Sequence, residues 1–350
     1  MMKAYFQKRI LRFRKPAGTS RGIMLRKPLW YLYFYEETEP QVKGIGECSI
    51  IPGLSIDDDT KVEEKLSEIC KQINSGEYDF SKQLYDFPGI NFAIETALHD
   101  LNANGTKVLF PSDFTDGKAG IPINGLVWMD SKEKMLQQVK EKIELGFHCI
   151  KLKIGAIDLD DELSILRYIR ENYSQDELEI RVDANGNIDL NDVRNVLKKL
   201  AELGVHSIEQ PIIPSQIEEM AELCRNTAIP IALDEELLGK YPFENKRRLI
   251  EIIRPQYLVL KPGLLGGFNE TTEWINIANE FSIDWWITSA LESNIGLNAI
   301  SQWTYTLGNS RYHGLGTGSL YHENVGCPLY VNGEKIFYNP LQKWNFEFVY

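Results

Sequence analysis

The stretch CIKLKIG at Cys149–Gly155, followed by EIRVDAN at Glu179–Asn185, sets the spacing on which the fold prediction rests. Both are short β-rich runs, and a stretch with helical spacing, Asp161–Asn172, separates them. Six similar runs extend the series in both directions: IPINGLV from Ile121, HSIEQP from His206, PIALDEE from Pro230, YLVLKPG from Tyr257, DWWITSA from Asp284 and YHGLGTG from Tyr312. Eight nearly equal β/α units predict a closed parallel barrel of the TIM type, in the α/β class.

The regions on either side of this series predict two further parts of the chain. Residues 1–115 begin with strand patterns and continue with helical ones, which indicates an α+β domain. The expected elements are strands at Tyr5–Arg14, Trp30–Tyr35 and Gly44–Ile50 and helices at Asp57–Ile73 and Phe92–Asn102. Residues 116–320 form the barrel. Residues 321–350 contain a hairpin around Asn332-Gly333 and are expected to pack back on the first domain.

Composition limits the function. The chain has 350 residues and a formal net charge of −12, which argues against a nucleic-acid partner. No apolar run approaches the roughly 20 residues that span a bilayer, so no membrane partner is expected. Five scattered cysteines without a CxxC pair indicate reduced thiols and a cytoplasmic location. The sequence does not indicate the oligomeric state.

Two lysines end the second β-run. Lys151 and Lys153 stand at i and i+2, so their side chains project to the same face of a strand. If that face is the barrel interior, like charge and desolvation both disfavour protonation, and one lysine could act as a base. The alternative is a pair of solvated lysines on an edge strand.

Carboxylates end the next three runs: Asp183, Glu209 and Asp234. Singly, each could cap a following helix. Together at one barrel mouth they would repel one another unless a cation lay among them. Hard oxygen ligands in this number suit Mg²⁺, and Mn²⁺ is expected to substitute. We therefore predict a metal site at the carboxyl ends of the strands, where barrel active sites form.

Lys261 ends the sixth run, four strands from Lys153 in a ring of eight. A barrel interior is narrow enough for two such side chains to face each other across a small substrate. A metal ion and facing lysines suit removal of a proton next to a carboxylate, because they offset the charge of the enediolate that forms. The expected partner is therefore a small-molecule carboxylate.

This order of residues resembles the muconate-cycloisomerase-like group of the enolase superfamily, for which a lysine base and Mg²⁺ are already described. The resemblance covers nearly the whole chain. It is carried by the runs above together with GIGECS (Gly44–Ser49), FAIETALHDL (Phe92–Leu101), LVLKPGLLGG (Leu258–Gly267), ITSALESNIG (Ile287–Gly296) and HGLGTGSLY (His313–Tyr321). The segment Lys261–Gly267 is similar to the pattern of the o-succinylbenzoate synthase family. The segment 316–318 lacks the acidic residues by which dipeptide epimerases hold an amine.

The resemblance implies a dehydratase that acts in menaquinone biosynthesis. It would remove the alpha proton and then water, in syn geometry, from 2-succinyl-6-hydroxy-2,4-cyclohexadiene-1-carboxylate. Lys153 would be the base and Lys261 would lie over the opposite ring face, while Lys151 would hold the carboxylate. An N-acylamino-acid racemase or a cycloisomerase would use the same groups. A barrel that serves as a non-catalytic scaffold is a more distant alternative, and it would be expected to lack one of these groups.

The resemblance also assigns supporting residues. Arg181 and Asn185 match positions that flank the first metal ligand, and Ser289 could bind the succinyl carboxylate or cap the next helix. The first domain would cap the barrel mouth. Its loops Pro16–Gly22 and Ile50–Ile56 could be lids that exclude water, or plain turns.

Overall fold

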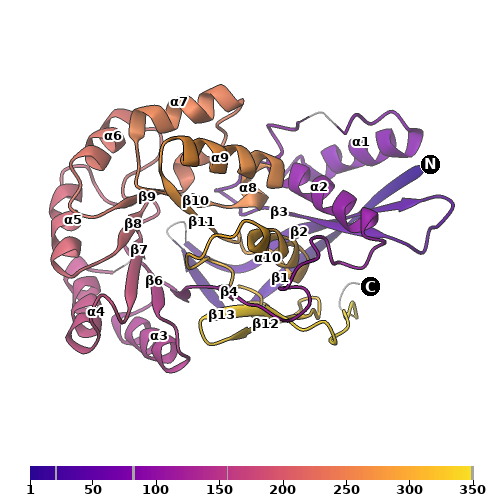
Figure 1. Ribbon diagram of the computed structural model, residues 1–350. Helices are drawn as coiled ribbons and strands as arrows, with labels where there is room; N and C mark the ends of the chain where they lie inside the picture. The colour runs from indigo at the N-terminus through magenta and orange to yellow at the C-terminus, as the bar shows by residue number, and fades with distance from the viewer. Residues whose placement is uncertain (20–21, 81–82, 156, 348–350) are drawn as a thin grey trace.

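The computed structural model describes residues 1–19, 22–80, 83–155 and 157–347. The N-terminal part is a three-stranded antiparallel sheet covered by two helices, at the right of Figure 1. Its elements are β1 (Met2–Thr19), β2 (Gly22–Glu36), β3 (Gly44–Ser49), α1 (Val62–Ser75) and α2 (Pro88–Asn102). Gly46 lets β3 approach α2, because a Cβ there would lie 1.8 Å from the carbonyl oxygen of Ala93. The expected α+β arrangement is present.

The two helices differ from their expected bounds at their first residues. The helix expected from Asp57 begins only at Val62, because the Asp57 carboxylate instead accepts hydrogen bonds from the Gly89 N–H at the start of α2. The second helix begins at Pro88, four residues earlier than expected. Proline suits the first turn of a helix, where its missing N–H costs nothing.

The barrel is a seven-stranded parallel sheet in sequential order, at the left of Figure 1. Its strands are β5 (Gly125–Val127), β6 (Cys149–Lys153), β7 (Glu179–Asp183), β8 (Ser207–Glu209), β9 (Ile231–Leu233), β10 (Tyr257–Leu260) and β11 (Asp284–Ile287). The main helices that follow them are α3 (Lys132–Glu144), α4 (Leu159–Asn172), α5 (Val193–Glu202), α6 (Ile217–Arg225), α7 (Phe243–Ile253), α9 (Phe268–Glu280) and α10 (Asn294–Thr306). The short elements η1 (Glu235–Leu237) and α8 (Pro262–Leu265) follow β9 and β10.

The eighth run closes the ring without forming a named strand, which corrects the expectation of eight strands. His313 and Gly314 form single parallel bridges to Ile123 and Thr288. Gly314 N donates to Ile287 O at 2.8 Å, and Asn124 N donates to His313 O at 2.9 Å. These bonds join the two ends of the sheet, so the TIM-type topology is retained.

The first run also divides. β4 (Ile121–Pro122) leaves the barrel and pairs with β13 (Lys335–Tyr338), which forms a hairpin with β12 (Leu329–Asn332) around Asn332-Gly333 as expected. Upstream of this hairpin, Tyr321 packs in a cluster with Phe13 of β1. The last segment therefore contacts both other parts of the chain. The three domain boundaries stay a prediction.

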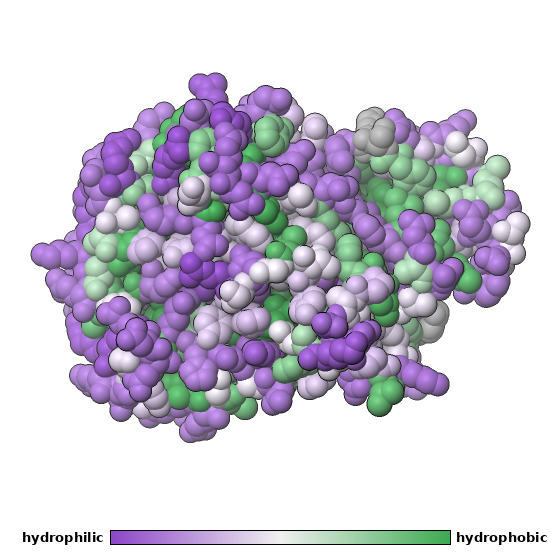
Figure 2. Space-filling view, viewed as in Figure 1, coloured by the Kyte–Doolittle hydropathy of each residue, from purple (hydrophilic) through white to green (hydrophobic). Residues whose placement is uncertain are grey.

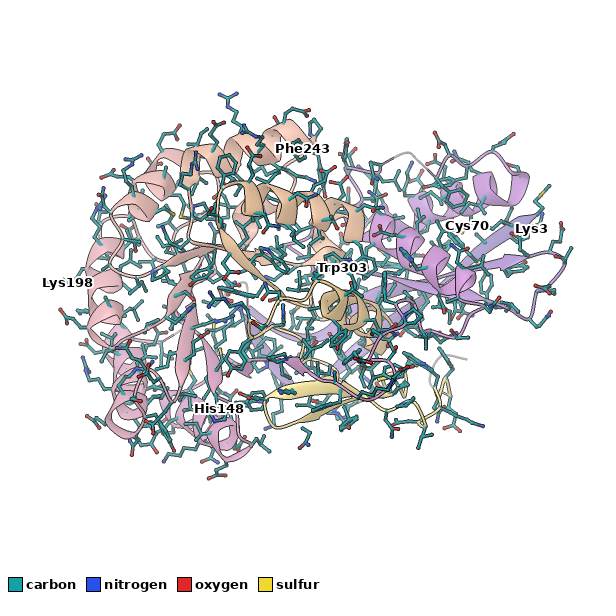
Figure 3. All side chains as sticks on the ribbon, viewed as in Figure 1. Lys3, Cys70, His148, Lys198, Phe243 and Trp303 are labelled. Atoms are coloured by element: carbon teal, nitrogen blue, oxygen red, sulfur yellow. The ribbon has the colours of Figure 1, made fainter. Side chains whose placement is uncertain are left out.

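The helices are amphipathic, and this holds them on the barrel. In α5 the buried residues Val193, Val196, Leu197 and Leu200 recur with helical spacing, while Lys198 points outward (Figure 3). Figure 2 accordingly shows mainly hydrophilic residues over the barrel side of the molecule. Among the described residues, no helix is long and apolar enough to cross a membrane.

Candidate active site

The register of neighbouring strands brings the predicted charged residues together. Lys153 pairs with Asp183 across β6 and β7, and Asp183 pairs with Glu209 across β7 and β8. Asp234 and Lys261 come directly after β9 and β10. All five therefore lie at the carboxyl ends of the strands. His148, labelled in Figure 3, precedes β6 and marks the opposite end of the barrel.

The lysines form ion pairs with the carboxylates. The Nζ atom of Lys151 lies 3.0 Å from Asp183 Oδ2 and 2.5 Å from Glu209 Oε2. The Nζ atom of Lys153 lies 3.1 Å from the same Asp183 oxygen. Lys261 donates to Asp234 and lies 3.9 Å from Glu209 Oε1. Because all six side chains are nearly buried, the interpretation of Lys151 and Lys153 as solvated edge-strand residues is wrong.

Asn185 and Glu235 extend this network. The Lys153 Nζ atom donates to Asn185 Oδ1 at 2.7 Å, and Asn185 Nδ2 donates to Glu235 Oε1 at 3.0 Å. Asn185 has a left-handed backbone with φ of 46°, which asparagine tolerates better than most residues. Glu235 was not predicted as a site residue, although the second acid of ALDEE is a visible signal for it.

Burial and charge shift the pKa values of these groups. Burial opposes the charged form of Lys261, but Asp234 and Glu209 outweigh that effect and raise the pKa. The pKa of Lys151 is also raised, because Asp183 and Glu209 outweigh its burial. Burial and the nearby Asp183 carboxylate raise the pKa of Glu209 to about 8, and burial raises the pKa of Asp234.

The donor set fits a hard divalent cation. Three carboxylates converge, and Glu209 Oε1 is buried without a hydrogen-bond partner in the described part of the chain. Burial raises the carboxyl pKa values of Glu209 and Asp234, whereas Lys151 and Lys153 outweigh burial and lower the pKa of Asp183. The lysine ammonium groups contact the carboxylate oxygens. Among the described residues, no three His, Cys, Asp or Glu side chains are arranged so that they could hold a metal ion. Assignment of the metal ligands stays a prediction.

A cavity of about 800 Å³ lies above these groups. Its lining includes Lys151, Lys153, Asp183, Asn185, Glu235, Lys261 and Ser289, together with apolar residues such as Leu126, Trp128 and Leu291. From the expected lids, Ile51, Pro52, Leu54 and Gly22 also line it. Pro16–Gly22 is not a plain loop, because residues 16–19 belong to β1, while residues 20–21 lie outside the described residues. That these segments move as lids stays a prediction.

The two other predicted residues differ in position. Ser289 lines the cavity and shares a 2.7 Å hydrogen bond with Thr317 Oγ1. It does not cap α10, because Ser293 occupies that position. Arg181 lies one layer deeper, where its Nε donates to Glu179 at 2.6 Å and its guanidinium stacks on Trp286. Arg181 therefore supports the barrel interior and does not line the cavity among the residues that the structure describes.

Known proteins resemble the chain in sequence. Residues 134–338 match the family described as "Enolase C-terminal domain-like". The o-succinylbenzoate synthase of Desulfotalea psychrophila (strain LSv54 / DSM 12343) is 42% identical, over 95% of this chain and 98% of that protein.

Solved structures extend the likeness to the fold. The crystal structure of MenC from Desulfotalea psychrophila LSv54 has a TM-score of 0.84 and 38% identity, and the match covers 96% of this chain and 99% of that one. A dipeptide epimerase from Enterococcus faecalis V583, complexed with Mg and the dipeptide L-Leu-L-Tyr, has a TM-score of 0.80 at 16% identity, over 97% of both chains. This second match shows the fold alone. The chain therefore belongs to the enolase superfamily and, within it, to the o-succinylbenzoate synthase family.

Proposed function

We propose that this protein is a dehydratase that converts 2-succinyl-6-hydroxy-2,4-cyclohexadiene-1-carboxylate into o-succinylbenzoate and water, in menaquinone biosynthesis. The observation that supports this most strongly is a pair of lysines, Lys153 and Lys261, on opposite sides of the barrel above three carboxylates. The 42% identity to an o-succinylbenzoate synthase selects this reaction among those of the superfamily.

Asp183, Glu209 and Asp234 would hold one Mg²⁺, and Mn²⁺ would substitute for it. The bound ion supplies positive charge that offsets the charge developing on the substrate carboxylate. The support for this proposal is the convergence of three buried carboxylates and the orphaned Glu209 oxygen. A fold relative that is complexed with Mg agrees with it.

Lys153 is proposed as the base. Its Nζ would take the alpha proton, and the pair of electrons from that C–H bond would move into the ring system. The same ammonium group would then return the proton to the departing hydroxyl on the same face. The C–O bond breaks, water leaves, and the ring becomes aromatic without an oxidant. Asn185 orients Lys153 through the 2.7 Å hydrogen bond.

The other lysines would stabilise charge. Lys151, which is held between Asp183 and Glu209, would bind the substrate carboxylate. Lys261 would lie over the opposite face of the ring, where a cation is attracted to the developing π-system. Ser289 would contact the succinyl carboxylate from the cavity wall.

A second candidate is the racemisation of N-acylamino acids, which the same pair of lysines could perform. A proton taken by Lys153 on one face could be replaced by Lys261 on the other. Dehydration is the easier reaction, because loss of the hydroxyl group converts the intermediate into an aromatic ring. No carbon atom has to be reprotonated.

The test is a comparison of kcat/KM for three reactions: the dehydration, the racemisation of N-succinylamino acids and the epimerisation of dipeptides. We expect dehydration to be fastest and dipeptides to react poorly. A faster racemisation or epimerisation would show that the choice of reaction is wrong while leaving the superfamily intact.

We also propose that the protein works in the cytoplasm. All five cysteines are buried free thiols, which suits a reducing compartment.

A further inference from the structure

The wall of the cavity that follows β11 has a strained backbone. Thr288, Ser289, Ala290 and Leu291 all line the cavity. Leu291 has φ of 61°, a left-handed conformation that is unfavourable for a side chain of its size. Such a conformation persists only where the surroundings over-determine it. The contacts that hold this segment therefore set the shape of the wall.

One of these contacts comes from the N-terminal sheet. Lys27 of β2 is fully buried, and its Nζ donates to the carbonyl oxygen of Leu291 at 3.1 Å and to the hydroxyl of Ser49 on β3. Tyr321 donates its hydroxyl to the same carbonyl oxygen at 2.6 Å. Two donors from distant parts of the chain thus fix the strained residue.

A second contact fixes the start of the next helix. Glu47 of β3 is fully buried and accepts hydrogen bonds from the N–H groups of Ser293 and Gly296, at 2.7 and 2.8 Å. It also accepts from the Ser293 hydroxyl at 2.6 Å, and Tyr31 of β2 donates to that hydroxyl at 2.9 Å. A carboxylate at a helix N-terminus satisfies free N–H groups and complements the helix dipole.

Glu292 lies between the cavity wall and the turn that follows Lys261. Its Oε2 accepts from Ala290 N at 2.7 Å, and a Cβ on Gly263 would lie 2.4 Å from its Oε1. Gly263 stands two residues after Lys261. Burial raises the pKa of Glu292 to about 7, although Lys27 opposes the shift. The network therefore extends from β2 and β3 to the cavity wall and to the turn that follows Lys261.

We propose that Lys27 and Glu47 are positioning residues that hold the 288–291 wall in its substrate-binding shape, so that the N-terminal sheet controls substrate affinity. This inference rests on the proposed function for its kinetic test. Fully buried ionic groups are costly to desolvate, and hydrophobic residues of similar size would often stabilise a fold as well. Stability alone therefore does not explain why ionic groups are buried beside the strained backbone of the cavity wall. Holding that backbone in position does explain it.

The experiment compares Lys27→Met and Glu47→Gln with Lys246→Met. Lys246 is a matched control, since it is also fully buried and forms ion pairs with Glu270 and Glu273. It is not one of the described residues that line the cavity. We expect KM for the cyclohexadiene substrate to rise about tenfold in the first two variants, as for one lost charge-assisted hydrogen bond, with kcat changed far less. Lys246→Met should lower Tm and leave KM unchanged.

Amide hydrogen exchange supplies a readout that does not depend on turnover. Faster exchange is expected at Ser293 and Gly296 in Glu47→Gln and across residues 288–292 in Lys27→Met, with no change there in Lys246→Met. Unchanged KM and unchanged exchange in both variants would overturn the inference. If the wild type does not dehydrate the substrate, the proposed function is wrong. Amide hydrogen exchange then tests by itself whether Lys27 and Glu47 hold the wall in position.

Tyr31→Phe is the milder variant for the case in which the buried-charge variants do not fold. It removes only the hydroxyl that donates to Ser293. Exchange at Ser293 should still increase. Unchanged exchange there would count against the inference.

Discussion

The two lysines of β6 contact the same carboxylate oxygen of Asp183, but their other partners differ. Asp183 Oδ2 lies 3.0 Å from the Lys151 Nζ atom and 3.1 Å from that of Lys153. Lys151 also contacts the Glu209 carboxylate, whereas Lys153 contacts the neutral amide of Asn185. A carboxylate favours the charged form of a lysine more than an amide does. Lys151 is therefore held between two carboxylates, whereas the second partner of Lys153 is a neutral amide that orients its Nζ atom.

This difference predicts the outcome of substitution. Lys153→Ala should lower kcat by several orders of magnitude, because a positioned base contributes roughly 10²–10⁴-fold and its charge also assists. Binding of o-succinylbenzoate, measured by calorimetry, should largely survive. Lys198→Ala, on the outer face of α5, is the control and should behave as wild type. If Lys153→Ala retains kcat while Lys261→Ala is inactive, the two roles are reversed.

A buried carboxyl outside the cavity predicts a dependence of stability on pH. Burial raises the pKa of Asp57 from 3.8 to about 7, although the Gly89 N–H opposes the shift. The folded state then binds this proton more tightly than the unfolded state does. The contribution to stability is full below pH 4 and is lost as the pH rises through 7.

The test is the difference in Tm between Asp57→Asn and wild type. Asparagine cannot ionise, so the Tm of the variant should rise relative to that of the wild type as the pH increases from 4 to 7. Exposed Asp58, whose pKa is lowered by Thr60 and Lys61, gives the control Asp58→Asn, for which the difference should stay constant. A constant difference for Asp57→Asn as well would contradict the assignment.

At the scale of residues, the sequence predicted the charged groups of the site. It did not predict the residues that hold the cavity wall in position. Lysines and carboxylates at the ends of β-runs were predicted to meet because parallel strands in register align their carboxyl ends, and they do. Arg181 shares that face and stands two residues before Asp183 on β7, so it lies one layer deeper. Lys27 and Glu47 were not predicted, since the backbone groups that they bind at Leu291 and Ser293 lie more than 240 residues away.

At the scale of elements, the eighth run shows what periodicity can and cannot foresee. Its spacing placed it correctly in the ring, but two glycines and a short stretch of pairing leave only bridges at His313 and Gly314. Helix bounds also depended on tertiary partners, because the Asp57 side chain is used at the start of α2 and not in α1. Periodicity therefore located the elements more accurately than it located their ends.

The barrel closure predicts unequal effects for two neighbouring glycines. A Cβ on Gly314 would lie 2.7 Å from the Thr288 side chain, at the point where the ring closes. A Cβ on Gly316 would meet its nearest atom, Ile123 Cδ1, at 3.4 Å, which is ordinary contact. Gly314→Ala should therefore lower Tm by several degrees, as core overpacking of roughly 1–3 kcal/mol would. Gly316→Ala should leave Tm almost unchanged, and equal losses would disprove this account of the closure.

At the scale of the whole molecule, the cavity joins residues that no local pattern connects. Gly22 of the N-terminal sheet, Lys153 and Lys261 of the barrel and Val331 of the C-terminal hairpin all line it. The division into an N-terminal unit and a barrel predicted a site at the barrel mouth. The cavity wall could not be predicted, because it depends on how the long β1–β2 pair packs against the barrel (Figure 1).

The charge of the site predicts that a divalent cation stabilises the entire fold. The site buries three carboxylates together, those of Asp183, Glu209 and Asp234, so an ion that binds only the folded state should stabilise it and raise Tm. At an ion concentration of 100 Kd, the free energy of unfolding should increase by about 2.7 kcal/mol. Exhaustive chelation with EDTA should abolish turnover, and Mg²⁺ or Mn²⁺ should restore it. Asp234→Asn should lose the rise in Tm. Asp284→Asn, at the opposite end of the barrel, should retain it. Full activity after chelation, or an equal rise in Tm for both variants, would rule out these three carboxylates as the metal site.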